Sequence, residues 1–170
     1  MSLKTNVITA AIFAAAAGIS FTANAAPSQD VLLQGVITDT TCDVVANNGS
    51  ATLDVGVYTA VSFVPSTQNG AVPLEVVLEN CSADETGDLL ILGTAASTDA
   101  NIFTTSTADT VGFMIQDSTS AQVPVDGGVT INTTIAGPNT YTFSVGMATT
   151  DNPPLAGAYS APVTVAYLVL

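Results

Sequence analysis

The sequence contains no histidine and no tryptophan, and Lys4 is its only basic residue. The 14 aspartate and glutamate residues give the chain a net charge of −13 at pH 7. A surface of this kind repels phosphate backbones and anionic membranes, so nucleic acid is excluded as a partner. The usual catalytic bases, oxyanion clamps and phosphate ligands are missing after Lys4. We therefore expect no enzyme and no cofactor, and we expect basic partners wherever charge guides binding.

The amino-terminal residues have the three regions of a secretory signal peptide. Lys4 supplies the positive charge, residues 7–21 form an apolar run, and Ala23 and Ala25 are small residues before a cleavage site. The run is too short to span a bilayer comfortably, which favours cleavage after Ala25 over an uncleaved anchor. Removing 25 of the 170 residues leaves 145, a length that suits one exported domain.

Cys42 and Cys81 are the only two cysteines. In an exported chain an isolated pair is more often a disulfide than a metal or redox site. A reactive thiol pair needs nearby cationic groups to lower the thiol pKa, and the chain has none after the signal. We therefore predict a Cys42–Cys81 disulfide, which closes a long loop and stabilises the domain by roughly 4 kcal/mol.

Period-two alternation of apolar residues dominates the chain after residue 31 and predicts short, half-buried β-strands. The clear cases are 74–78, 111–115, 141–147 and 159–169, and the weaker ones are 42–45, 51–57, 89–92, 122–125 and 129–135. Residues 94–109, rich in Ser, Thr, Ala and Asp, have the least pattern and are predicted to form a surface loop. Many short strands at this spacing predict an all-β sandwich or barrel.

The segment before Cys42 breaks the phase of this alternation. Its apolar side and its glycine fall on odd positions, at Val31, Leu33, Gly35 and Ile37, whereas Cys42 and Val44 fall on even ones. Residues 38–41 supply no apolar residue between them. The segment is therefore interpreted as an arm, residues 26–37, that pairs apart from the strand bearing Cys42, followed by a domain at 38–170. The alternative is one long first strand with a bulge.

Four stretches together resemble the pilin subunits assembled by the chaperone-usher pathway, the family of type 1 and P pilus subunits. Residues 33–37 (LQGVI) lie shortly before Cys42, as an apolar run with glycine does in that family. Residues 73–80 lead into Cys81, residues 111–117 are similar to a central strand, and residues 157–167 are similar to the terminal strand. One departure is that Leu168, Val169 and Leu170 follow Tyr167, whereas family members usually stop one residue after the final aromatic.

The resemblance implies an immunoglobulin-like β-sandwich that lacks its final strand and is completed by the arm of a neighbouring subunit. It implies export through the periplasm to a surface fimbria, with other pilin subunits, a periplasmic chaperone and an outer-membrane usher as partners. Val31, Leu33, Gly35 and Ile37 become the donor residues. The groove residues are expected to be Phe143, Val145, Val163, Val165 and Tyr167, although they could equally be sandwich core. The implied function is a structural subunit of an adhesive fimbria.

Two other interpretations remain. A receptor-binding or carbohydrate-binding adhesin, or a minor tip subunit, could use the same sandwich, but a tip adhesin has no donor arm. The densest acidic cluster, Asp84, Glu85 and Asp88, does not have the spacing of a calcium-binding EF-hand loop. It is expected to be a solvated turn, so no metal site is predicted.

Overall fold

The computed structural model describes residues 42–151 and 153–169, and over these ranges β-strands are the dominant regular structure, with only two short 3₁₀ turns besides them. The expected signal peptide and donor arm lie outside the described residues. The strands are β1 (Asp43–Ala46), β2 (Asn69–Glu79), β3 (Glu85–Leu92), β4 (Thr94–Ala96), β5 (Asp99–Thr104), β6 (Val111–Gln116), β7 (Gln122–Val123), β8 (Gly127–Thr133), β9 (Asn139–Thr149) and β10 (Thr164–Val169). Two short 3₁₀ turns, η1 (Asn47–Gly49) and η2 (Ala60–Ser62), lie between β1 and β2. The all-β prediction is confirmed.

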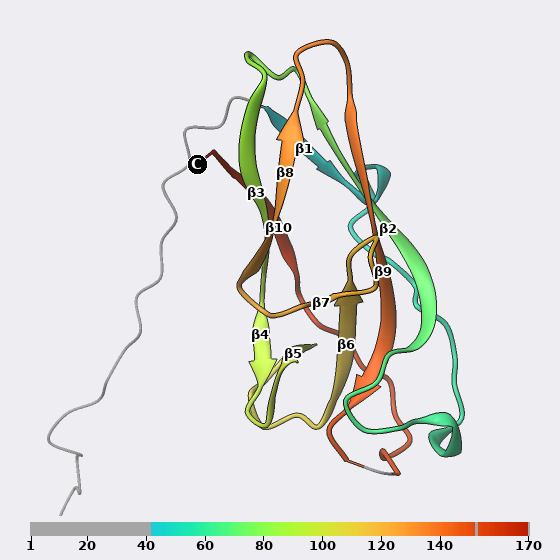
Figure 1. Cartoon of the computed structure of the whole chain (residues 1–170). Coiled ribbons are helices and arrows are strands. Elements are labelled where there is room, and N and C mark those ends of the chain that lie inside the picture. The colour runs from blue at the N-terminus through green and yellow to red at the C-terminus, as the bar shows by residue number, and fades with distance from the viewer. Residues whose placement is uncertain (1–41, 152, 170) are drawn as a thin grey trace, which may run out of the picture. The chain divides into compact units, whose positions relative to one another are not determined.

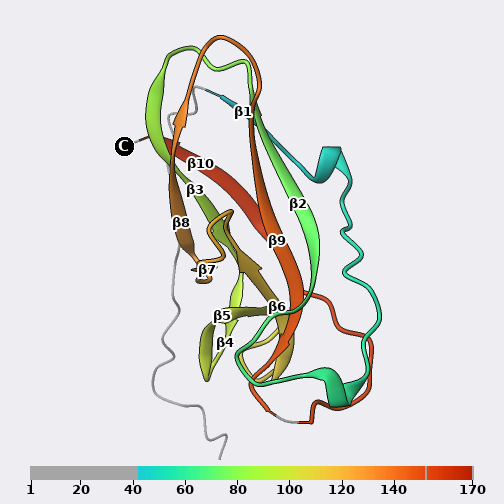
Figure 2. The ribbon, with the colours of Figure 1, turned by 45° about the vertical axis from the view of Figure 1, so that its right-hand side comes forward.

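The strands form two antiparallel sheets (Figures 1 and 2). The larger sheet has the order β1-β2-β9-β6-β5-β4, with β7 added to part of β6. The smaller sheet has the order β10-β3-β8. The carboxyl-terminal strand β10 is therefore at an edge, and so is β1 in the other sheet. Tyr167 pairs with Leu89, and the ladder continues through Leu168 and Val169, which settles the register of the residues after the last aromatic.

The two sheets share one apolar core. Leu74, Val76 and Phe143 of the larger sheet pack in the same cluster as Leu89 and Tyr167 of the smaller one. Alternate residues of β2 and β3 are buried, as expected for strands with one face on a core. A satellite cluster of Ala96, Ile102, Met114 and Ala148 lies under the β4–β5 hairpin.

The predicted disulfide between Cys42 and Cys81 is present. It joins the residue before β1 to the turn after β2, where Asp43 pairs with Glu79. Nearby, the Asn80 amide donates a hydrogen bond to the Asp43 carboxylate at 2.8 Å. The first strand is therefore fastened at its beginning by a covalent bond and a side-chain bridge.

Several strand predictions are confirmed and others are wrong. Strands lie at 74–78, 111–115, 141–147 and 89–92, and near the other predicted positions, with two exceptions. Residues 51–57 form no strand, and residues 159–163 are not part of β10, which begins at Thr164. The predicted loop at 94–109 is also wrong, because it contains β4 and β5 with Ile102 and Phe103 fully buried.

In the part of the chain that the structure describes, no helix has the length and apolar character needed to cross a membrane.

Candidate functional site: an apolar groove between two strand edges

A large groove opens between the edges of β1 and β10. Its volume is about 1320 Å³, above the range of about 300–1,000 Å³ that is usual for small-molecule sites. The lining residues are mainly aliphatic and aromatic, and Asp54 is the only charged one among them. A groove of this size and polarity suits a segment of polypeptide better than a small polar ligand.

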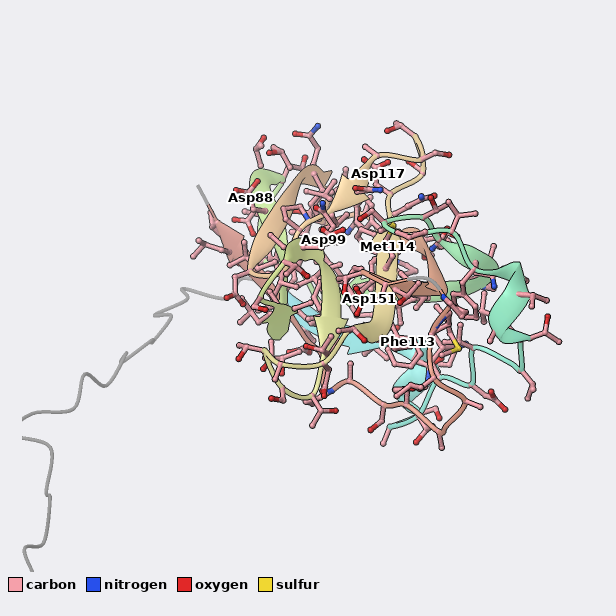
Figure 3. The ribbon with its side chains drawn as sticks, turned by 90° about the horizontal axis from the view of Figure 1, so that it is seen from below. Asp88, Asp99, Phe113, Met114, Asp117 and Asp151 are labelled. Atoms are coloured by element: carbon pink, nitrogen blue, oxygen red, sulfur yellow. A yellow bond between two sulfur atoms is a disulfide. The ribbon has the colours of Figure 1, made fainter. Side chains whose placement is uncertain are left out.

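The floor of the groove is the inner face of the larger sheet. Leu74 of β2, Phe113 and Ile115 of β6, and Val145 and Met147 of β9 line it. Side chains of a strand alternate between its faces, so Phe113 lies on the groove side whereas its neighbour Met114 enters the satellite cluster (Figure 3). The floor is therefore a continuation of the sandwich core.

One wall of the groove is the extended segment 51–58, which follows β1. Hydrogen bonds within the segment fix its local conformation: the Tyr58 hydroxyl donates to the Val55 carbonyl at 2.8 Å, and the Asp54 carboxylate accepts from the Gly56 amide at 2.9 Å. Tyr58 also packs edge-on against Phe63, with ring centroids 6.3 Å apart, and covers Gly70, where any side chain would collide with the Tyr58 ring. No strand among the described residues pairs with this wall.

The opposite wall is the segment 154–163, which leads into β10. The Tyr159 hydroxyl donates to the Leu155 carbonyl at 2.7 Å, and the Thr105 hydroxyl donates to the Ser160 carbonyl at 2.6 Å. Pro162 has no backbone N–H, which disfavours a ladder at this point. The sequence predicts strands at 51–57 in one wall and from 159 in the other, and the structure leaves both walls without a strand partner among its described residues.

The structure separates the five predicted groove residues into two groups. Val145, Val163 and Val165 line the groove. Phe143 and Tyr167 are instead buried in the core beneath it, with exposed fractions of 3% and 1%. The predicted donor residues Val31, Leu33, Gly35 and Ile37 lie outside the described residues. The alternation of the sequence could not reveal the walls as groove residues, because a core and a groove floor share the same pattern.

The hydroxyl of Tyr167 lies in the core, 3.4 Å from the Thr133 hydroxyl. Burial raises the pKa of Tyr167 above its ordinary value of 10.0, the Thr133 hydrogen bond partly offsets this, and the nearby Glu85 carboxylate adds to it. Burial also raises the pKa of Tyr141, which senses the charge of Tyr167. One oxygen of Glu85 is buried without a hydrogen-bond partner among the described residues.

The acidic side chains of the described residues are not grouped around a common point. Over residues 42–151 and 153–169, no group of three or more His, Cys, Asp or Glu side chains is arranged to hold an ion. Asp88, Asp117 and Asp151 lie well apart in the view from below (Figure 3). A hydrogen bond from the Thr119 hydroxyl, with others from the Ala121 and Thr119 amides, lowers the pKa of Asp117 although burial opposes this, so this carboxylate caps a turn. The groove is therefore a site for apolar contacts.

Comparison with known families decides what kind of protein has this groove. The family model described as "Fimbrial protein" matches residues 31–167. The chain belongs to the fimbrial protein family. Membership of this family indicates a structural protein of a surface fimbria and not an enzyme. No curated protein sequence matches the chain significantly.

Solved structures show the fold that the chain shares. The P pilus rod subunit PapA superposes with a TM-score of 0.62 at 15% identity, over 77% of this chain and 100% of that one. A chaperone-usher pilus structure, described for the basis of rod uncoiling, superposes with a TM-score of 0.60 at 16% identity, over 86% of this chain and 98% of that one. The two antiparallel sheets of this fimbrial protein therefore have the arrangement of these pilus subunits.

Proposed function

We propose that the chain is a structural subunit of a surface fimbria that polymerises by strand addition and supports adhesion. The observation that carries the proposal is the groove, whose two walls are extended segments without a strand partner in the described structure. An added strand between them would find a free edge on β10 and an apolar floor below. Backbone hydrogen bonds along such an edge supply affinity, and alternate side chains enter the floor.

The arm at residues 26–37 is the proposed donor, supplied by the next copy of the chain. Its odd positions carry Val31, Leu33 and Ile37, so one face of an extended arm is apolar. Each branched side chain transferred from water to the groove contributes roughly 1.5–3 kcal/mol. Gly35 has no side chain and allows the arm backbone to approach the groove closely at that position.

The remaining partners follow from the need to protect this groove before assembly. An open apolar groove beside a free strand edge promotes aggregation, so a subunit needs a temporary occupant during export. We propose a periplasmic chaperone for this step and an outer-membrane usher for the exchange. The signal peptide at 1–25 would bring the chain into the periplasm, where the Cys42–Cys81 disulfide can form.

The proposal is tested with two variants of the arm. Leu33→Asp places a charge in the groove and should block incorporation into fibres sheared from the cell surface. Gln34→Asp adds the same charge on the opposite face and should be incorporated nearly as well as the wild type. A synthetic peptide of residues 26–37 should also bind and stabilise the arm-deleted domain. Equal incorporation of the two variants, or a peptide that does not bind, contradicts strand addition.

A further inference from the structure

The exposed apolar side chains are unevenly distributed between the two ends of the sandwich. We call the end where β1 begins and β10 ends the upper end, and the end where β10 begins and β9 ends the lower end (Figure 1). Among the described residues, the exposed large apolar side chains are Val57, Val61, Val64, Ile135, Leu155 and Val163. Ile135 belongs to the upper end, in the turn between β8 and β9, and the others belong to the lower end.

At the lower end, two loops project exposed aliphatic side chains on either side of the groove mouth. Val57 and Val61 of the loop around η2 are 98% and 89% exposed, and Leu155 of the loop after β9 is 83% exposed. Val57 and Leu155 both line the groove, and Val61 directly follows Ala60, which lines it too. We call Val57, Val61 and Leu155 the lower patch. Its side chains belong to neither core cluster of their own domain, so they are available for contact with a partner.

At the upper end, a small hollow lies beside the point where the described chain begins. It has a volume of about 280 Å³ and is lined by Glu79, Asn80, Ile135, Gly137 and Pro138. The Asn80 side-chain amide donates a hydrogen bond to the Asp43 carboxylate. The Asn139 side-chain amide donates to the Thr134 carbonyl and to Cys81 Sγ, and it therefore connects the turn between β8 and β9 to the disulfide. The hollow and Ile135 are thus fixed next to Cys42, the residue that follows the arm.

We propose that the lower patch of each subunit docks on the upper hollow of the subunit that donates its arm. This inference rests on the proposed strand addition and specifies a second contact between the same two copies. Every strand pairing in the described structure is antiparallel, and parallel pairing is slightly less stable. An arm antiparallel to β10 ends with Ile37 at the lower end of the acceptor.

Chain length then brings the two ends together. Residues 38–41 are all that separate the arm from Cys42, and four extended residues span at most about 14 Å. The upper end of the donor, with Ile135 and the hollow, is therefore held next to the lower patch of the acceptor. A tether this short gives a high effective concentration, so a patch of three or four aliphatic side chains is sufficient to form the contact.

Charge does not attract two copies at this interface. The upper end carries Asp43, Glu79 and Asp84, and the lower end carries Asp151, which follows β9. The described residues include no Lys, Arg or His, so no ion pair between side chains of two copies can form there. Burial of the lower patch supplies the attraction that charge cannot, and the short tether makes a second copy the occupant that we assign.

The test uses fibres of the full-length chain with cysteines at both ends, Leu155→Cys with Ile135→Cys. A short bis-maleimide reagent should link neighbouring subunits into a ladder of multimers on denaturing gels. The control pair is Thr119→Cys with Ile135→Cys, since Thr119 lies in the exposed turn between β6 and β7, away from both ends. We expect the yield of linked multimers to exceed that of the control pair at least about tenfold.

A second pair of variants tests the same contact in case the cysteine variants do not assemble into fibres. Val61→Asp should give fibres that dissociate at a lower temperature than fibres of Thr119→Asp, because each adds one charge and only the former charges the lower patch, at a residue that does not line the groove. Fibres of the Leu155→Cys with Ile135→Cys chain that give no more linked multimers than the control pair, or equal dissociation temperatures of the two Asp variants, overturn the end-to-end contact. Absence of fibres from the wild-type chain overturns strand addition itself, so the two failures are distinguishable.

Discussion

At the scale of single residues, Tyr167 shows how a terminal strand is held in place. Its ring is fully buried and its hydroxyl reaches Thr133 of β8. The sequence leaves Tyr167, which alternates with Val163 and Val165, open between a wall of the groove and the sandwich core. The structure places it in the core. Its ring lies over Gly87 of β3, and its hydroxyl therefore reaches Thr133 of β8, the third strand of the smaller sheet.

The raised pKa of Tyr167 makes stability fall at alkaline pH. The folded state favours the protonated phenol of Tyr167. The contribution of this preference to the free energy of unfolding is complete below the unfolded-state pKa of 10.0, and it is lost as the pH rises through the higher pKa of the folded state. Tyr167→Phe should lose stability less steeply above about pH 10, with Tyr141 accounting for part of the remaining loss. Thermal melting between about pH 8 and pH 12 measures this. Identical pH profiles of variant and wild type contradict it.

At the scale of secondary-structure elements, Gly87 decides how closely β10 approaches β3. A Cβ atom at Gly87 would lie 2.5 Å from the Leu168 carbonyl oxygen and 2.5 Å from the Tyr167 ring. Backbone and a buried ring cannot move aside cheaply, so Gly87→Ala should reduce the free energy of unfolding by about 1–3 kcal/mol. Gly157→Ala, whose Cβ would meet only the Tyr159 ring at 3.5 Å, is the control. Denaturant unfolding of both variants tests the difference, and equal stability contradicts it.

Val163 and Thr164 provide a matched pair on the acceptor side of the groove. Val163 lines the groove and is partly exposed, whereas Thr164, the next residue, begins β10 and does not line it. Val163→Asp should therefore weaken binding of the arm of another copy, and Thr164→Asp should have a small effect. The measurement is the affinity of the peptide 26–37 for each arm-deleted variant. Similar affinities for the two variants mean that Val163 does not contact the arm.

Whether a strand can be predicted from the sequence depends on what the alternation of apolar residues indicates. Alternating apolar residues indicate an extended chain with one buried face, and this located β2, β6 and β9 correctly. The same pattern at 51–57 and 159–163 also predicts strands. In the structure these segments turn apolar side chains toward the groove, but they are not hydrogen-bonded to a neighbouring strand among the described residues. A hydrogen-bonded ladder depends on a partner, which local sequence does not encode.

The β4–β5 hairpin was missed for the opposite reason. Its outer positions are Ser, Thr, Ala and Asp, and only Ile102 and Phe103 are large apolar residues within it. Thr104 is buried too. Its hydroxyl donates to the carbonyls of Thr94 and Ser106, so a polar side chain that the sequence suggests is exposed is satisfied inside the fold. The disulfide was predictable because two cysteines have one possible pairing, whereas the groove required knowledge of which edges remain unpaired.

At the scale of the whole molecule, all charged side chains after Lys4 are acidic. Copies of the chain after residue 25 repel one another at every distance, because each carries 14 carboxylates and no basic side chain. Contacts between copies must overcome this repulsion, which salt screens over about 10 Å at 0.1 M. Fibres should therefore become more resistant to heat as sodium chloride increases. Light scattering during thermal dissociation measures it, and a fall in resistance with salt would indicate ion pairing with another component.

The position of the disulfide also determines how a domain bears mechanical load. In a fibre assembled as proposed, a pulling force enters each domain at Cys42. Without the bond, the force would load only the four residue pairs of β1 with β2, which begin at Asp43 and Glu79. The Cys42–Cys81 bond carries the force past β1 into β2, whose long ladder with β9 is then loaded in shear, so that many hydrogen bonds must break together. A crosslink at the edge of the sheet thus makes the central strands the load-bearing part of the fibre.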